Sequence, residues 1–259
     1  MVYFTYSEGF RLGGENSPRA AATGFFPYNY GPDLLQNYEA GMKSEWLENR
    51  LQLNVTFFLM EWSDIQLNSS VGGGAPWWLR GTFNGETGES KGVEISGEWQ
   101  ATDNLVFQGS AFFNDSEYTA DTLTPSGGLY LQDGQEMPNS PDTKYWLAAE
   151  YTIPEVFGGD LWFRYDTSYQ SETWDNLDAA LDNDLEALIP SWTSSNLQIG
   201  LNRETWDVSL MARNIWNDKG INSLINSTYA SDFFGVDQFR NERTVQRPRT
   251  ISLSLRKRF

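Results

Sequence analysis

The chain has 259 residues, a formal net charge of −17 at pH 7, and neither Cys nor His. A chain with this much negative charge repels polyanions, so we expect no nucleic-acid partner. Without Cys and His there are no disulfides, thiolate sites, His-ligated metals or usual catalytic triads, and we expect no enzyme and no cofactor. The sequence has no run of ~18 apolar residues, so a helical membrane protein is excluded.

Apolar and polar residues alternate with period two in about ten segments, which is typical of β-strands that have two unlike faces. The first, Val2–Tyr6, opens the chain without an export signal, so we expect a fragment or a start assigned downstream of the true one. In chain order the expected strands are 2–6, 38–46, 51–59, 93–99, 105–113, 145–151, 161–169, 197–201, 206–212 and 251–259.

The two faces of these strands favour a membrane barrel over a soluble β-sandwich. The polar faces carry charges at mid-strand that need water, and a lumen supplies it. These charges either contact whatever fills the lumen or pair within the wall, namely Glu39, Lys43, Glu94, Glu98, Glu150, Arg164, Asp166 and Arg213. The apolar faces end in aromatic residues where an interfacial girdle is expected, at Tyr38, Trp46, Trp99, Phe113, Tyr145, Tyr151, Trp206 and Phe259.

Short and long connections alternate along the whole chain. The short ones are 47–50, 101–104, 154–160 and 202–205, and the long ones are about 8–34, 66–88, 115–142, 171–190 and 216–248. Outer-membrane barrels have short periplasmic turns and long extracellular loops. We therefore expect an all-β fold, an antiparallel transmembrane β-barrel segment of about ten strands, with Phe259 on the periplasmic side.

Five stretches resemble, in order and spacing, the C-terminal barrel half of TonB-dependent receptors. They are Val2–Arg11 with Gly13-Gly14, the "YE-x-G-x-K" strand at Asn37–Ser44, the "KGVE" strand at Lys91–Glu98, the "N-L-F-D-K" corner at Arg213–Lys219, and the "RPR" lead-in to the last strand at Arg247–Thr250.

This resemblance implies an integral protein of the bacterial outer membrane, embedded in its lipid bilayer. Such transporters have 22 strands around a plugged lumen. Residues 1–259 are then the C-terminal part of the barrel, with the plug domain and TonB box absent, and TonB acts through that missing N-terminal region. The implied function is uptake of a scarce nutrient, a ferric siderophore by default, with cobalamin, saccharides and other chelates open.

Two other functions are weighed against uptake. One is a passive porin, or a self-contained small outer-membrane barrel, whose strands would have to close without further partners. The other is an outer-membrane enzyme such as a protease or lipase, which the absence of His disfavours.

The sequence offers three candidate sites, each with a plainer explanation. Terminal Phe259, with Leu255, Leu253 and Ile251 at alternate positions, resembles the signal read by the outer-membrane assembly machinery, or is an ordinary last strand. Trp77, Trp78 and Arg80 are ligand-contact candidates, or anchor their loop. The acidic loops 115–142 and 171–190 could bind Ca²⁺ or a cationic ligand, although solvated surface charge is the favoured interpretation.

Overall fold

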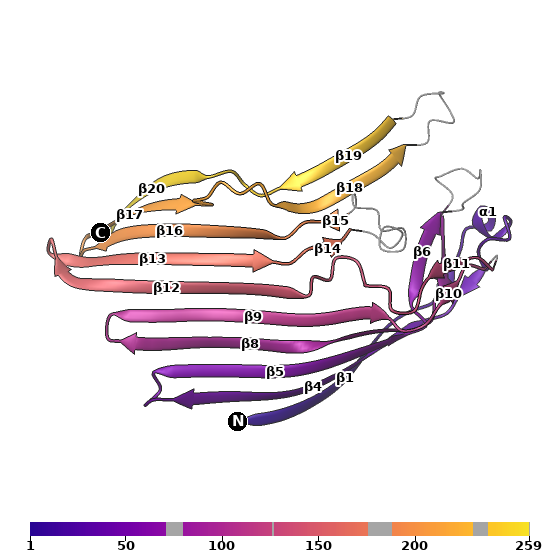
Figure 1. Ribbon diagram of the computed structural model, residues 1–259, viewed down its shortest axis with the longest axis horizontal. Coiled ribbons are helices and arrows are strands. Elements are labelled where there is room, and N and C mark those ends of the chain that lie inside the picture. Colours follow the sequence, from indigo (N-terminus) through magenta and orange to yellow (C-terminus); the bar gives the residue numbers. More distant parts are fainter. Residues whose placement is uncertain (71–79, 126, 176–187, 230–237, 259) are drawn as a thin grey trace.

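Ten antiparallel strands form one sheet in the computed structural model, which describes residues 1–70, 80–125, 127–175, 188–229 and 238–258. Neighbours in the sheet are neighbours in the chain apart from the small strands within the loops (Figure 1). In sheet order these strands are β1 (Val2–Arg11), β4 (Asp33–Trp46), β5 (Leu51–Ser63), β8 (Gly88–Thr102), β9 (Leu105–Tyr118), β12 (Thr143–Val156), β13 (Gly159–Gln170), β16 (Trp192–Asn202), β17 (Trp206–Arg213) and β20 (Thr250–Lys257).

The sheet is an open wall. Strands β1 and β20 lie at its two ends, and they are not paired with each other in the described part of the chain. The expected all-β, antiparallel, ten-stranded fold is confirmed, and the barrel is not closed by these residues.

The register places the apolar residues of successive strands in rows on one face, which we call the outer face. One row runs through Phe4, Ala40, Phe57, Val93 and Phe113. These side chains remain open, with Phe4 70% and Phe57 61% exposed. An apolar surface of this extent indicates contact with lipid or another apolar partner.

Aromatic residues border this outer face at both ends of the strands. Tyr6 packs on Tyr38 at 5.1 Å and Tyr145 on Tyr169 at 5.0 Å near the long connections, whereas Trp99 stacks on Phe107 at 5.6 Å near the short turns. Tyr145 and Tyr151 lie about 20 Å apart along β12 at ~3.3 Å per residue, close to the height of the apolar band of an outer-membrane barrel. Aromatic residues therefore lie at both ends of this face, where the sequence predicts a girdle.

The short turns lie at one end of the wall, which we call the turn end. The expected turn 154–160 is too long, because β12 continues to Val156 and β13 begins at Gly159. Pro154 lies at an irregularity in the register between Ile153 and Val156. A residue without a backbone N–H is tolerated at such a position, so Pro154 does not end the strand.

The long connections meet at the opposite end, the loop end, and each contains a small two-stranded sheet. Among the described residues, no helix is long and apolar enough to cross a bilayer. The small elements are β2 (Gly14–Glu15), α1 (Pro18–Ala21), β3 (Asn29–Tyr30), β6 (Gln66–Ser70), β7 (Arg80–Asn84), β10 (Thr122–Leu123), β11 (Leu129–Leu131), β14 (Thr173–Trp174), β15 (Leu188–Ile189), β18 (Ile221–Tyr229) and β19 (Gln238–Val245).

The buried apolar cluster of the described chain lies in these loops, not in the wall. We call it the loop core, and its members are Ala20, Phe26, Ile65, Leu67, Phe83, Tyr118 and Leu131. Burial in this cluster raises the pKa of Tyr118 to about 12, because the phenolate would lose its water. The wall needs no such core, since its apolar side chains face outward.

Candidate functional site

The inner face of the wall, opposite the apolar outer face, is hollowed near the loop end. Two adjoining cavities of about 560 and 470 Å³ share Ser168, Gln170 and Trp192 in their linings. We call this continuous depression the inner groove. It carries polar and aromatic side chains together, which is typical of ligand sites.

Two neighbouring rows of the register explain the shape of the groove. One row consists mainly of small side chains, Ser96, Ser110, Trp146, Ser168 and Ser194. The next row toward the loop end contains larger ones, Glu94, Phe112, Lys144, Gln170 and Trp192. The serines form a low floor between bulkier neighbours, so the depression follows directly from the residue sizes at alternate positions.

Aromatic rings border the groove on the side of β8 and β9. Phe112 stacks on Phe58 with ring centroids 5.6 Å apart and planes inclined by 1°. The stack requires glycine at position 92, because a Cβ there would lie 2.8 Å from Phe58 Cζ and 2.0 Å from the backbone oxygen of Phe113. This flat apolar surface is suited to stacking on a planar part of a ligand.

The charges of the inner face nearer the turn end pair with one another. Arg164 contacts Glu150 at 3.2 Å and donates to Gln108 at 3.3 Å, and Gln108 donates to Glu98 at 2.7 Å. Asn196 also donates to Asp166 at 2.7 Å. These contacts favour pairing within the wall as the role of these four charged side chains.

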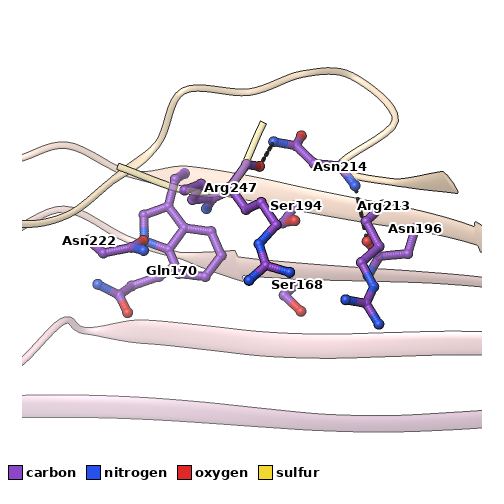
Figure 2. Close-up of a pocket in the computed structure, with 10 residues that line it drawn as sticks. Ser168, Gln170, Ser194, Asn196, Arg213, Asn214, Asn222 and Arg247 are labelled. Carbon is purple, nitrogen blue, oxygen red and sulfur yellow. Dashed lines mark hydrogen bonds between the residues drawn. The ribbon is translucent and has the colours of Figure 1, made fainter. Parts of the chain in front are cut away.

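The opposite border of the groove is cationic. Arg213 ends β17 and Arg247 precedes β20, and Figure 2 shows both side chains extending from the same corner of the chain toward Ser168. Neither guanidinium forms an ion pair within the described part of the chain. Arg213 is thus a predicted lumen charge that lies beside an open cavity without a counter-charge in the described part of the chain.

Asn214 builds the corner that holds both arginines. It is 4% exposed, and its φ of 49° is a left-handed conformation that asparagine tolerates better than most residues. Its side-chain NH₂ donates to the backbone oxygens of Asp218 at 2.8 Å and Arg247 at 3.0 Å, and its backbone N–H donates to Asn196 Oδ1 at 3.1 Å. The two motifs at Arg213–Lys219 and Arg247–Thr250 thus form a single unit.

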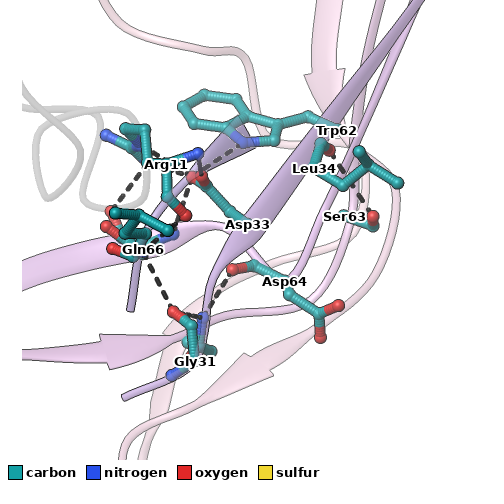
Figure 3. Close-up of polar contacts among 10 residues, drawn as sticks. Arg11, Gly31, Asp33, Leu34, Trp62, Ser63, Asp64 and Gln66 are labelled. Carbon is teal, nitrogen blue, oxygen red and sulfur yellow. Dashed lines mark hydrogen bonds and ion pairs between the residues drawn. The ribbon is translucent and has the colours of Figure 1, made fainter. Parts of the chain in front are cut away.

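A second polar cluster fixes the base of the loops. Asp33 is 3% exposed and accepts hydrogen bonds from the Arg11 side chain at 2.8 Å, Trp62 Nε1 at 3.0 Å and the Gln66 N–H at 3.4 Å (Figure 3). Burial alone would raise the pKa of Asp33, but the bonds from Arg11, Trp62 and the backbone outweigh it and lower the pKa from 3.8 to about 2. The cluster ties β1, β4, β5 and β6 together.

The structure separates the predicted site residues from one another. Trp77, Trp78 and Phe259 lie outside the described residues, and so does the acidic run 182–186. Arg80 begins β7 and is exposed, away from the groove linings. Ile251, Leu253 and Leu255 lie on the outer face of β20, with 67%, 73% and 73% exposure. Within the described ranges, no three acidic residues are grouped as a metal site would require.

Sequence reasoning missed Phe112, Trp192 and Gln246 as groove residues. Phe112 and Trp192 occupy inward positions, which the alternation of their strands would have indicated. Gln246 lies in a long connection, where alternation gives no signal.

The sequence model described as "TonB dependent receptor-like, beta-barrel" matches residues 1–215. The chain belongs to this family of TonB-dependent receptor barrels. The family consists of outer-membrane transport receptors, which does not favour the passive porin or the enzyme.

Solved structures of TonB-dependent receptor barrels share the fold of this one. The ferric yersiniabactin uptake receptor FyuA from Yersinia pestis has a TM-score of 0.72 and 16% sequence identity to this chain. The match covers 100% of this chain and 35% of the FyuA chain. The ferric preacinetobactin receptor BauA from Acinetobacter baumannii has a TM-score of 0.66 and 17% identity, covering 98% and 33%. The copper transporter OprC has a TM-score of 0.60 and 12% identity, covering 98% and 36%.

The chain therefore spans about a third of the length of these receptors. At these identities the likeness shows the fold, while the ligands belong to the named proteins. No curated protein matches the sequence.

Proposed function

We propose that this TonB-dependent receptor barrel acts in the outer membrane, taking up a scarce nutrient, by default a ferric siderophore. One observation carries the proposal: a single ten-stranded wall is apolar on one face and carries a polar, aromatic-bordered groove on the other, below the loop end. The outer face suits a lipid bilayer, and the groove offers contacts to a ligand that arrives through the loops.

We also propose that residues 1–259 are the C-terminal part of a larger barrel that contains a plug. Unpaired strand edges are not tolerated in lipid, and the wall has them at β1 and β20 within the described residues. Further strands would satisfy both edges. TonB would then act through the plug of the complete receptor.

Two sets of residues keep proposed roles. Trp77, Trp78 and Arg80 are ligand-contact candidates, since an indole can stack on a ligand and a guanidinium can pair with an anion. Phe259, with Leu255, Leu253 and Ile251, is proposed as the signal for the outer-membrane assembly machinery. The exposed side chains of Ile251, Leu253 and Leu255 on the outer face of β20 support this proposal, because the signal consists of apolar residues at alternate positions.

The uptake function is tested by radioactive iron transport in a strain that lacks the complete receptor gene. The strain is supplied in turn with a ferric trihydroxamate, a ferric catecholate and a ferric carboxylate complex. We expect restoration of the gene to restore transport of at least one complex, and deletion of tonB to abolish it. Transport that persists without TonB, or gene-dependent permeation by unrelated small sugars, would support the passive porin instead.

A further inference from the structure

The two arginines of the inner groove point to the charge of the ligand. We propose that Arg213 and Arg247 form an oxyanion-recognition site, so that the imported ligand carries a carboxylate or another anionic oxygen group. This inference rests on the proposed uptake function and narrows its substrate class.

The first support is the contrast between these arginines and two others on the inner face, Arg164 and Arg258. Arg164 pairs with Glu150, and Arg258 pairs with Asp207 at 2.8 Å. Arg213 and Arg247 have no such carboxylate within the described residues, although the whole chain carries an excess of 17 negative charges. Arg213 and Arg247 line the same cavity, and an anion bound between them would replace the repulsion of two like charges by attraction to both.

The second support is a set of buried polar atoms without partners at the same cavity. Trp192 Nε1 and both amide atoms of Gln246 are buried and make no hydrogen bond in the described structure. Trp192 and Gln246 line the cavity together with the two arginines. An unsatisfied buried donor destabilises the folded state, and an indole N–H can only donate. An anionic oxygen would accept from this N–H, from the Gln246 NH₂ and from the guanidiniums.

The third support is the close packing of the backbone around the site. Asn214 fixes the backbone at Arg247, and Gly220 lies so close to the lining that a Cβ there would be 2.6 Å from Trp192 Cβ and 2.9 Å from Gln246 Nε2. A backbone and a Trp192 and Gln246 lining that are already packed lose little freedom when a ligand binds, which favours affinity.

The acidic loops do not contradict an anionic ligand. Their field is screened beyond about 8 Å at physiological ionic strength, whereas the two guanidiniums act at contact distance. The more serious rival is an acidic side chain of the segment that fills the lumen of the complete receptor. We favour the ligand because the site lies at the loop end of the wall, where β13 ends and β16 begins.

The experiment uses the complete receptor, purified in detergent, with Arg213→Gln, Arg247→Gln, the double variant and Arg256→Gln. Arg256 is on the inner face near the turn end, opposite Asp207 in the register and outside the cavity linings, so it is the matched control. Calorimetric titrations use ferric citrate as the anionic probe, iron-free citrate, and a neutral ferric trihydroxamate. Heat-modifiable mobility reports whether each variant is folded.

We expect each single substitution to weaken the binding of ferric citrate about tenfold and the double substitution about a hundredfold. The Arg256→Gln receptor and the binding of the neutral complex should stay unchanged. Citrate binding that is equal in the parent and double variant, or absent from the parent while the neutral complex binds, would overturn the oxyanion site and leave uptake standing. Arginine-dependent citrate binding in a receptor that transports no ferric complex would overturn the uptake function instead.

A last outcome concerns the rival occupant. If the double variant binds every probe normally but loses folded stability, the arginines hold the lumen-filling segment and the proposal is wrong. Lysine substitutions, which keep the charge but lose the planar fork, should recover part of the affinity for citrate if the site is correct.

Discussion

The side-chain NH₂ of Asn214 donates a 3.0 Å hydrogen bond to the backbone oxygen of Arg247, joining two segments that are 33 residues apart. The same side chain accepts from the Asp218 N–H at 2.9 Å. One buried amide therefore links the end of β17 to the start of β20 across the longest connection of the chain. This link gives a structural reason for the asparagine in the Arg213–Lys219 motif.

Substitution of Asn214 by Ala should destabilise the receptor by about 2–3 kcal/mol. The substitution removes the hydrogen-bond partners of buried backbone groups, and it puts alanine in a left-handed conformation that asparagine tolerates better. The free energy of unfolding can be measured by urea titration in detergent micelles. Asn214→Gly is the informative control, since it removes the hydrogen bonds but tolerates the φ of 49°. Equal stability of both variants and the parent would mean that the corner does not depend on this side chain.

The loop base at Asp33 should be stable at neutral pH and weaken only in strong acid. Its folded pKa of about 2 lies below the ordinary 3.8, so ionised Asp33 stabilises the fold above pH ~4 by about 2 kcal/mol. That contribution is lost as the pH falls from about 4 to about 2. Hydrogen exchange of the β6 amides at several pH values would measure it.

An Asp33→Asn receptor provides the comparison. Its loop base should exchange faster at pH 7 and should lack the acid transition of the parent. The same acid transition in both proteins would assign the effect to another group.

Replacement of Gly92 by Ala should disturb the wall near the groove. The added Cβ meets backbone at 2.0 Å, which side-chain movement cannot relieve, so we expect a lower melting temperature and weaker ligand binding. Gly9→Ala in β1 is a matched control, because a Cβ at Gly9 meets nothing within 4 Å. Comparable losses in the two variants would point to a general intolerance of alanine in these strands.

The two faces of β16 should respond oppositely to charge. Ile199 is on the outer face, whereas Gln198 is on the inner face directly opposite Arg164. Ile199→Glu should destabilise the barrel because it places a charge on the lipid face, while Gln198→Glu, which faces Arg164, should be tolerated. The yield of the heat-modifiable folded band measures both. Tolerance of Ile199→Glu would place this face in water.

The candidate sites outside the described residues have direct tests as well. Deletion of Phe259 should reduce the surface level of the complete receptor, measured by quantitative blotting of outer-membrane fractions, and an unchanged level would dismiss the assembly signal. Trp77→Ala and Trp78→Ala should lower ligand affinity if the indoles stack on the ligand.

Alternation predicted the outer face well, because the apolar residues of that face recur at every second position within each single strand. It failed at the loop ends of strands, where Ser7, Glu8 and Gln36 are polar on both faces although β1 and β4 remain paired there. For the same reason β16 begins at Trp192 instead of Leu197. The small loop sheets were not predicted, since strands of two or three residues are too short to show a period.

The groove was beyond sequence reasoning for a different reason. Its floor depends on the register that aligns Ser110, Ser168 and Ser194 across strands far apart in the chain. The pairing of Arg164 with Glu150 likewise follows from register, and from the single strand only their inward direction could be inferred.

The loop core has a consequence for engineering. Its residues come from three successive connections and the end of β9, for example Phe26, Phe83 and Leu131. Exchange of one of these loops for that of a relative would leave the other two with an unfilled hollow. Grafting a new specificity onto this receptor therefore requires all three connections to be transplanted as a block.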